Sequence, residues 1–258
     1  MKAIVTGSTH IRGQYLVHHL HNQNWQVLAW DRNIVSIFDE KEIYQFLSRT
    51  RVDTVFHLAN EKYNQGIKNE SWLVNYEWPR LLAKVCFKLN IKLVYLSSSD
   101  VFSSTITGPY RKQDKATARS GIGYEKRMAE YSLLSECPTC QIYRVGWLIT
   151  EGENKSHLIS DIIKQSTSDE KILLNKHYYP ACSFINQTYL AITNHLNLNG
   201  GIYHLDSNRM WSQYAIVKAL NKRYNLKLKI TQFKGSKLDE RLLEPQINMP
   251  PLSINLAF

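Results

Sequence analysis

The sequence lacks the features that mark membrane, disulfide-rich and low-complexity proteins. Its 258 residues contain no internal repeat, no low-complexity segment and no apolar run near the ~18 residues that span a bilayer. Of its four cysteines, Cys137 and Cys140 form a C-x-x-C pair, but no second pair or histidine cluster accompanies it. A zinc site needs such additional ligands. We therefore expect reduced, structural thiols, no metal and no membrane segment.

The composition is that of an ordinary globular protein, with 43% hydrophobic and 21% charged residues. The chain enters an apolar strand almost at once and shows no signal peptide, so we expect it to be cytoplasmic. A net charge of +10 attracts phosphates. The basic residues are scattered, however, and form no lysine-rich tail or aromatic-interleaved stripe. This pattern predicts a solvated surface rather than a nucleic-acid site.

The first 31 residues follow the layout of a dinucleotide-binding βαβ unit. A strand over 2–6 leads through a turn at 7–13 into a helix, and a second apolar run over 27–30 ends at Asp31. Such a turn places a helix N-terminus beside a pyrophosphate, where free N–H groups and the helix dipole favour anions. The predicted cofactor contacts in this unit are Gly7, Thr9, His10, Ile11, Gly13, Asp31 and Arg32.

The glycine turn departs from its usual pattern, because a G-x-x-G-x-x-G spacing needs a glycine where His10 stands. That glycine ordinarily lets the backbone approach the pyrophosphate without a Cβ. Three interpretations stay open: a bent turn that binds a dinucleotide with His10 donating to a phosphate, binding that is weak or of something smaller, and a purely structural unit. Asp31 could accept both ribose hydroxyls of NAD, whereas Arg32 could pair with the 2′-phosphate of NADP. We expect NAD or NADP, with a preference for NAD.

Strands and helices alternate through the first 150 residues. We expect further strands over 52–58, 92–96 and 140–147, and helices between them over 39–48, 72–89 and 124–135. This alternation predicts an α/β fold with a doubly wound parallel sheet. An open sheet of this kind binds its ligand at the carboxyl ends of the strands. The residues there include Leu58 and Ala59, which we predict as further cofactor contacts, and Ser98, Ser99 and Asp100.

The pattern weakens after residue 150. Helices are expected over 156–165, 183–196 and 211–224. The end of the chain carries several prolines and should be mostly extended. We therefore predict a dinucleotide-binding core over 1–150 and a small, discontinuous substrate-binding lobe over 151–258, with some segments returning to the core.

Taken together, these short motifs resemble the extended short-chain dehydrogenases/reductases, and within them the dTDP-4-dehydrorhamnose reductase group. The resemblance covers most of the chain and rests on the order and spacing of its pieces. They are the turn at 7–13, Ala29–Arg32, His57–Ala59, Asn75, Ser97–Phe102, Pro109–Tyr110 with Asp114, Arg144 with Trp147, Gly201–Leu205 and the tail around Asn248. The resemblance implies a Rossmann fold and reduction of a 4-keto nucleotide sugar with NAD(P)H.

The resemblance also implies a catalytic Tyr, a Lys four residues later that holds the nicotinamide ribose, and a Ser or Thr after the preceding strand. Lys126, supported by Glu130, fits the Lys, and Ser98 fits the Ser. Ile122 occupies the position of the Tyr and cannot donate a proton. Tyr124 is close, but it points about 200° around the helix from Ile122. It would need a local shift of two residues to complete a catalytic set of Ser98, Lys126 and Tyr124.

Two functions are compatible with these residues. The first is a nucleotide-sugar reductase with an atypical or altered reaction, in which Tyr110 and His57 are the alternative proton donors. The second is a non-catalytic relative that acts as a regulatory or scaffolding subunit, with a homodimer or another protein as partner. The predicted substrate contacts are Ser99, Asp100, Trp147, Arg209 and Arg241.

Overall fold

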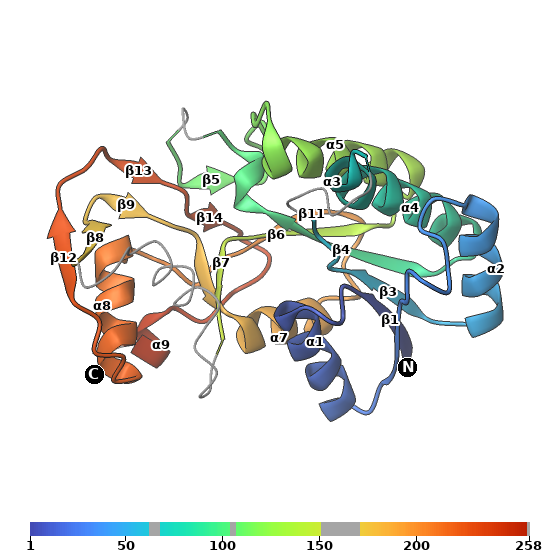
Figure 1. Cartoon of the computed structure of the whole chain (residues 1–258), viewed down its shortest axis with the longest axis horizontal. Coiled ribbons are helices and arrows are strands. Elements are labelled where there is room, and N and C mark those ends of the chain that lie inside the picture. Colours follow the sequence, from blue (N-terminus) through green and yellow to red (C-terminus); the bar gives the residue numbers. More distant parts are fainter. Residues whose placement is uncertain (62–67, 104–106, 151–170, 257–258) are drawn as a thin grey trace. The chain divides into compact units, whose positions relative to one another are not determined.

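The structure, a computed structural model, describes residues 1–61, 68–103, 107–150 and 171–256 (Figure 1). The chain divides into two compact units that interleave along the sequence. Unit 1 comprises Met1–Ser103, Lys115–Arg144 and Ile192–Tyr203, and unit 2 comprises Ser104–Asp114, Val145–Ala191 and His204–Phe258. The division into domains at residue 150 stays a prediction.

Unit 1 is built on a parallel sheet of six strands in the order β11-β6-β4-β3-β1-β2. Ile4 of β1 pairs with Leu28 of β2 on one side and with Val55 of β3 on the other. The chain therefore reverses its direction of travel across the sheet at β1, and ligands of such sheets bind at this switch point. The strands are β1 (Lys2–Thr6), β2 (Gln26–Ala29), β3 (Thr54–His57), β4 (Lys92–Ser98), β6 (Gln141–Val145) and β11 (Gly201–Leu205).

Helices cover both faces of this sheet. Helices α2 (Glu40–Thr50), α4 (Trp78–Lys88) and α5 (Gly121–Glu136) lie on one face, and α1 (Ile11–Asn22) lies on the other (Figure 1). The first face holds an extensive hydrophobic core of unit 1, because the three helices pack apolar side chains against the sheet. The doubly wound α/β fold is thus confirmed. The core residues of this face include Ile43, Leu47, Val55, Trp78, Leu82, Cys86, Leu93, Ala129, Leu133 and Ile142.

Two predicted elements contain an irregularity. The helix expected over 72–89 is present as a continuous helical stretch over 70–88, in which a π-helical turn, η1 (Leu73–Glu77), lies between α3 (Glu70–Trp72) and α4. The strand expected over 140–147 ends at Val145, and β7 (Trp147–Ile149) begins after Gly146. A Cβ on Gly146 would lie 2.1 Å from the carbonyl oxygen of Ala181, so only glycine fits at this break.

Unit 2 contains pairs of short parallel strands that the sequence did not predict. Among the described residues of this unit, four two-stranded sheets pair β7 with β10, β8 with β12, β9 with β13 and β5 with β14. Strands of two to four residues are too short for an alternation pattern to reveal them. They are β5 (Tyr110–Arg111), β8 (Ile172–Asn175), β9 (Tyr178–Tyr179), β10 (Cys182–Phe184), β12 (Ile230–Phe233), β13 (Leu238–Asp239) and β14 (Leu242–Leu243).

The helices expected after residue 170 are present. They are α7 (Ile185–Asn194) and α8 (Gln213–Arg223), and a short α9 (Ser253–Leu256) follows near the end of the chain. The helix predicted over 156–165 lies outside the described residues. Among the residues that are described, no helix has the length and apolar character needed to cross a membrane.

Candidate functional site

Two glycines of the turn after β1 are required by close backbone contacts. Gly7 has a φ of +69°, and a Cβ there would lie 2.9 Å from the backbone nitrogen of Ala59. A Cβ on Gly13 would lie only 2.2 Å from the carbonyl oxygen of Gly7. These contacts press the start of α1 against the turn and the turn against the loop after β3. The two retained glycines therefore maintain the tight strand-to-helix geometry of a phosphate-binding turn.

His10 stands in place of the middle glycine without disturbing that geometry. Its backbone is extended (φ −79°, ψ 151°), and its exposed side chain caps α1, with Nδ1 accepting from the backbone N–H of Arg12 at 3.4 Å. A hydrogen bond of this length is weak. The first turn of α1 carries no acidic residue, so the partial positive charge of the helix N-terminus is not neutralised there. The turn thus keeps the electrostatics that favour an anion.

The loop after β3 is fixed by Thr6 and by a buried His57. The Thr6 hydroxyl accepts from the backbone N–H groups of Leu58 and Ala59, both at 3.1 Å, and lies 3.0 Å from Nδ1 of His57. Since both hydroxyl lone pairs are used, its proton is donated to Nδ1, and His57 carries its own proton on Nε2. Leu58 and Ala59, predicted as cofactor contacts, are therefore held beside Gly7.

His57 is not placed to act as a proton donor. Its ring is buried, stacks on Tyr95 at 5.7 Å and meets Trp78 edge-on at 4.8 Å, and Nε2 has no hydrogen-bond partner among the described residues. Burial, aided by the nearby charge of Lys126, lowers the pKa of His57 to about 3. The ring is therefore neutral near pH 7, and its role is to pack the sheet beneath the loop.

Asp31 and Arg32 follow β2 and are exposed, as a contact to a cofactor ribose requires. Asp31 Oδ1 accepts from the backbone N–H of Asn33 at 2.8 Å. Arg32 Nη1 lies 3.5 Å from Oε1 of Glu70, a residue that is only 4% exposed. Sequence reasoning did not single out Glu70, because it lies 38 positions away and belongs to no motif.

A second network anchors the end of the loop after β3. Asn75, in the π-helical turn, accepts from the backbone N–H of Glu61 at 3.0 Å and donates to the carbonyl oxygen of Glu61 at 2.7 Å. Its amide nitrogen and the Ser71 hydroxyl both donate to Oε2 of Glu125, at 2.7 Å each. Asn75 thereby ties the loop at Glu61 to helix α5. Asn75 belongs to the motifs quoted above, whereas nothing in the sequence indicated Ser71 or Glu125.

Lys126 and Ser98 lie at the carboxyl end of β4. The Lys126 ammonium donates to the carbonyl oxygen of Leu96 at 3.0 Å and sits 5.0 Å from the centre of the Tyr95 ring. Burial first, and then the charge of Arg12, lower the pKa of Lys126 to about 8. The Ser98 hydroxyl accepts from the backbone N–H of Asp100 at 3.2 Å, which leaves its proton able to be donated elsewhere.

Glu130, whose spacing supports the assignment of Lys126, has hydrogen-bond partners that the sequence did not indicate. Its carboxylate accepts from the Ser97 hydroxyl at 2.6 Å and from Arg144 at 3.0 and 2.7 Å. Both Glu130 and Arg144 are buried. A buried, hydrogen-bonded ion pair of this kind holds α5 against β4 and β6. Glu130 acts on Lys126 through its charge, which raises the Lys126 pKa against the dominant effect of burial.

The register of α5 is fixed, and Tyr124 does not share the partners of Lys126. A Cβ on Gly123 would lie 2.1 Å from the carbonyl oxygen of Asp100, so the helix cannot shift along its axis at this point. Tyr124 stacks on Trp72 at 6.2 Å, and the guanidinium of Arg127 lies 5.2 Å from its ring. In this structure Tyr124 therefore lies against Trp72 and Arg127, and its place in a catalytic set with Ser98 and Lys126 stays a prediction. Ile122 lies in the first turn of α5, one turn before Lys126.

The predicted substrate contacts divide between the units. Ser99 and Asp100 form the short helix η2 (Ser99–Val101) of unit 1, with Ser99 buried and Asp100 exposed. In unit 2, Trp147 meets Tyr178 edge-on at 5.8 Å. Tyr110, the other alternative donor, is buried in unit 2, and burial raises its pKa to about 12. The raised pKa makes the phenol a weaker acid, and the buried ring offers no exposed hydroxyl.

Two predicted arginines are engaged in holding unit 2 together. Arg209 donates to the carbonyl oxygens of Asp206 at 3.0 Å and Met249 at 2.8 Å. Arg241 binds the Asp239 carboxylate through Nε at 2.9 Å and Nη2 at 2.7 Å, and also donates to the Arg209 carbonyl. These contacts give both side chains a structural role, and their roles as substrate contacts stay predictions.

Asp206 joins three segments of unit 2 near those arginines. Its carboxylate accepts backbone N–H groups from Cys182 at 2.9 Å, Asn208 at 2.7 Å and Leu242 at 2.9 Å. Burial raises the Asp206 pKa to about 7, against the opposing effect of these three hydrogen bonds. Sequence reasoning missed this residue, since its partners are spread over 61 positions of the chain.

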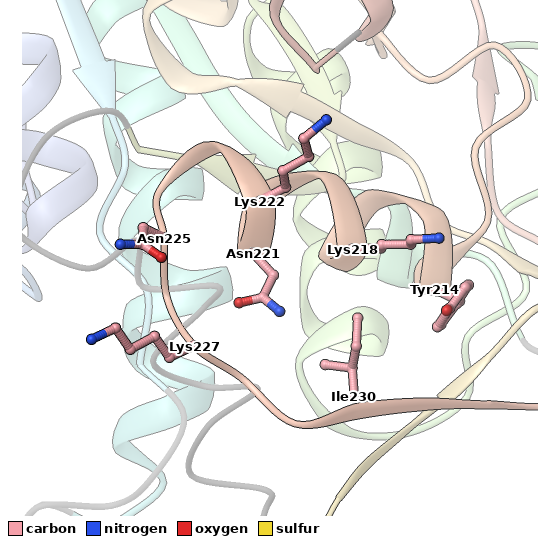
Figure 2. A pocket seen from close by; sticks show the side chains of 7 residues that line it. All are labelled: Tyr214, Lys218, Asn221, Lys222, Asn225, Lys227 and Ile230. Carbon is pink, nitrogen blue, oxygen red and sulfur yellow. The ribbon is translucent and has the colours of Figure 1, made fainter. Parts of the chain in front are cut away.

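A hollow of about 330 Å³ lies between α8 and β12 in unit 2. Figure 2 shows that Lys222 and Lys227 extend in different directions rather than toward a common point. Asn221 is occupied in binding the backbone of Leu228 through both side-chain atoms, at 3.0 Å each. A ligand site requires polar groups that converge, and the hollow does not provide them. Its lining residues are Tyr214, Lys218, Asn221, Lys222, Asn225, Lys227 and Ile230.

The cysteines and metal ligands add no further site. All four cysteines are free and buried, and burial raises the pKa values of the Cys86, Cys140 and Cys182 thiols. Within the described ranges, no three His, Cys, Asp or Glu side chains are grouped as metal ligands.

Known proteins match the chain over most of its length. The Bacillus subtilis spore coat polysaccharide biosynthesis protein SpsK is 20% identical over 232 residues, which is 89% of this chain and 81% of that protein. Methionine adenosyltransferase 2 subunit beta from Xenopus laevis is 21% identical over 243 residues, which is 87% of this chain and 72% of that protein.

Solved structures share the fold. The dTDP-4-dehydrorhamnose reductase from Bacillus anthracis, in complex with NADP, superposes with a TM-score of 0.81 at 18% identity and covers 99% of this chain and 95% of that one. The Bordetella bronchiseptica enzyme WbmH, in complex with NAD+, has a TM-score of 0.77 at 17% identity and covers 99% of this chain and 95% of that one.

A family model described as the RmlD substrate binding domain matches residues 1–246. Together with the six-stranded parallel sheet, its switch point at β1 and the glycine turn, this match confirms the resemblance drawn from the sequence. The chain belongs to the RmlD substrate-binding-domain family, a group of extended short-chain dehydrogenases/reductases that includes the dTDP-4-dehydrorhamnose reductases.

Proposed function

We propose that this protein binds a nicotinamide dinucleotide at the carboxyl edge of the unit 1 sheet and acts on a nucleotide sugar by an atypical reduction. The main support for this proposal is the backbone of the turn, where Gly7 and Gly13 are both packed too closely to accept a Cβ. A turn of this kind followed by a helix N-terminus without acidic residues fits a pyrophosphate. Thr9, His10 and Ile11 would lie along it.

The rest of the edge fits the remainder of a dinucleotide. The exposed carboxylate of Asp31 suits ribose hydroxyls, and the loop at Leu58 and Ala59 is fixed beside Gly7. Lys126 would hold the nicotinamide ribose. When bound, the nicotinamide supplies a hydride. The family relatives named above include a dTDP-4-dehydrorhamnose reductase with NADP and an enzyme with NAD+, which supports this class of cofactor.

The reacting end differs from the pattern that the resemblance implies. The Ser98 hydroxyl, which already accepts from Asp100, would donate its proton to a substrate carbonyl. Ile122 offers no proton to a developing alkoxide. General acid catalysis is worth roughly 10²–10⁴-fold in rate, so reduction by the usual route would be slower by a factor of this order.

The test separates binding from turnover. Isothermal titration with NAD+ and NADP+ measures binding, and incubation of the pure protein with NADH or NADPH and a dTDP-4-keto-6-deoxysugar measures oxidation at 340 nm. We expect dinucleotide binding and slow oxidation. Absence of binding to both dinucleotides would refute the proposal.

A second candidate function is a non-catalytic binding subunit. Two observations favour it: Ile122 at the proton-donor position and the similarity to methionine adenosyltransferase 2 subunit beta, which is named as a subunit rather than a reductase. Binding of a dinucleotide without any oxidation at high protein concentration would favour this function over the first.

A further inference from the structure

A carboxylate outside the predicted site lies against the side chain that would discriminate between NAD and NADP. An Arg near the end of the second strand is the usual partner of the 2′-phosphate of NADP, and Arg32 stands at that place. Its guanidinium lies 3.5 Å from Glu70, in an ion pair whose side chains are 47% and 5% exposed respectively. The guanidinium is thus already paired with a buried carboxylate.

The local charges favour a ribose with a free 2′-hydroxyl. Oε1 of Glu70 lies 3.5 Å from Nη1 of Arg32, and Asp31, the preceding residue in the chain, is a second carboxylate. A 2′-phosphate that recruited Arg32 would compete with Glu70 for the guanidinium and would bring its own negative charge close to that carboxylate. A hydroxyl can donate to the Asp31 carboxylate without disturbing the pair.

We infer that Glu70 is a specificity-determining residue, which holds Arg32 away from the 2′-phosphate and biases the site toward NAD. This inference rests on the proposed dinucleotide binding and extends it to a residue that would not itself contact the cofactor. Glu70 begins α3, whereas Arg32 follows β2, so the preference depends on how two separate segments of unit 1 meet.

Isothermal titration of NAD+ and NADP+ against the wild-type protein and Glu70→Gln tests the inference. We expect the wild type to prefer NAD+, and Glu70→Gln to strengthen NADP+ binding by about tenfold, the scale of one modest charge interaction, with NAD+ binding changed less than about threefold. Glu77→Gln is the matched control, because it removes a similar pairing with Arg80 at 3.1 Å on the following helix.

Arg32→Met gives a second, independent measurement that does not depend on the fold of the Glu70 variant. If Glu70 keeps the Arg32 guanidinium from the 2′-phosphate, the Arg32→Met substitution alters the NADP+ dissociation constant by less than about threefold. A loss of tenfold or more would show that Arg32 already serves the phosphate and would overturn the inference. An unchanged NAD+ to NADP+ ratio in a folded Glu70→Gln would also overturn it. Failure of the wild type to bind either dinucleotide would instead refute the proposed function.

Discussion

The turn after β1 and the start of α5 each contain one residue, His10 and Ile122, that departs from the pattern implied by the resemblance. The two residues have different structural surroundings. At the turn, His10 is exposed while Gly7 and Gly13 keep every close backbone contact. At α5, Gly123 and Lys126 keep the helix in register, yet Ile122 brings no ionisable group. The first substitution leaves the backbone contacts of the turn intact. The second leaves the helix intact and, under the proposed function, concerns the group that would donate a proton, so we expect the two substitutions to affect function unequally.

Restoring the phenol should give the largest effect. Ile122→Tyr places a hydroxyl one helical turn before Lys126, and we expect reductase activity to rise by roughly 10²–10⁴-fold. NADH oxidation with a dTDP-4-keto-6-deoxysugar measures it. Tyr131→Phe, on an exposed position of the same helix, should leave the rate unchanged. If the Ile122→Tyr variant binds both ligands but reduces the substrate no faster, the isoleucine at position 122 does not limit the reaction.

Adding a side chain at Gly13 should destabilise the fold and weaken dinucleotide binding at the turn. The methyl group of Gly13→Ala would meet the Gly7 carbonyl oxygen at 2.2 Å, and overpacking of this kind costs about 3 kcal/mol of folding free energy. Urea denaturation measures the loss, and dinucleotide affinity should fall with it. His18→Ala, on the exposed side of α1, should change stability by less than about 0.5 kcal/mol. Equal stability of the two variants would contradict the tight packing of the turn.

The buried ammonium of Lys126 should give stability a distinctive dependence on pH. Its pKa is lowered to about 8 from 10.5, so between these values the unfolded chain holds a proton that the folded protein has released. Raising the pH through this window therefore stabilises the fold, by at most about 1.4 kcal/mol per pH unit. Thermal unfolding from pH 7 to 10 should show this gain relative to Lys126→Met. A parallel pH profile in the two proteins would show that the ammonium is not desolvated.

Removing the side chain of His10 should have the smallest effect. Its capping hydrogen bond is long, at 3.4 Å, and replacing a capping residue by Gly costs only a few tenths of a kcal/mol. We expect His10→Gly to change dinucleotide affinity by less than about threefold, as titration would measure. A hundredfold gain in dinucleotide affinity would mean that the His10 side chain obstructs the turn. The substitutions at positions 10 and 122 would then affect function to a similar extent.

How much of the site the sequence could predict depends on the range over which each residue acts. The turn at 7–13 and the acid at the end of β2 belong to one local unit, and Lys126 and Ser98 were found through a motif whose order is fixed along the chain. Glu125, Ser71 and Glu70 could not be found in this way. Each acts on a partner 38 to 54 positions away, and no local pattern encodes such a pairing.

For several residues that the sequence analysis singled out, the structure shows binding partners that the sequence did not indicate. Glu130 stands at the predicted spacing from Lys126, but its carboxylate binds Ser97 and Arg144. Arg209 and Arg241 are cations in the predicted substrate lobe, yet they bind carbonyl and carboxylate groups of their own unit. A sequence gives the chemistry of a side chain but not the acceptor nearest to it.

The sequence by itself determined the α/β class, the order of the main strands and the isoleucine at position 122, because apolar periodicity and residue identity are local properties. Only the tertiary structure decided that the turn tolerates His10, that Tyr124 packs on Trp72, and that Glu70 engages Arg32. These outcomes depend on where backbones approach one another and which charges meet, and both follow from packing between segments distant along the chain.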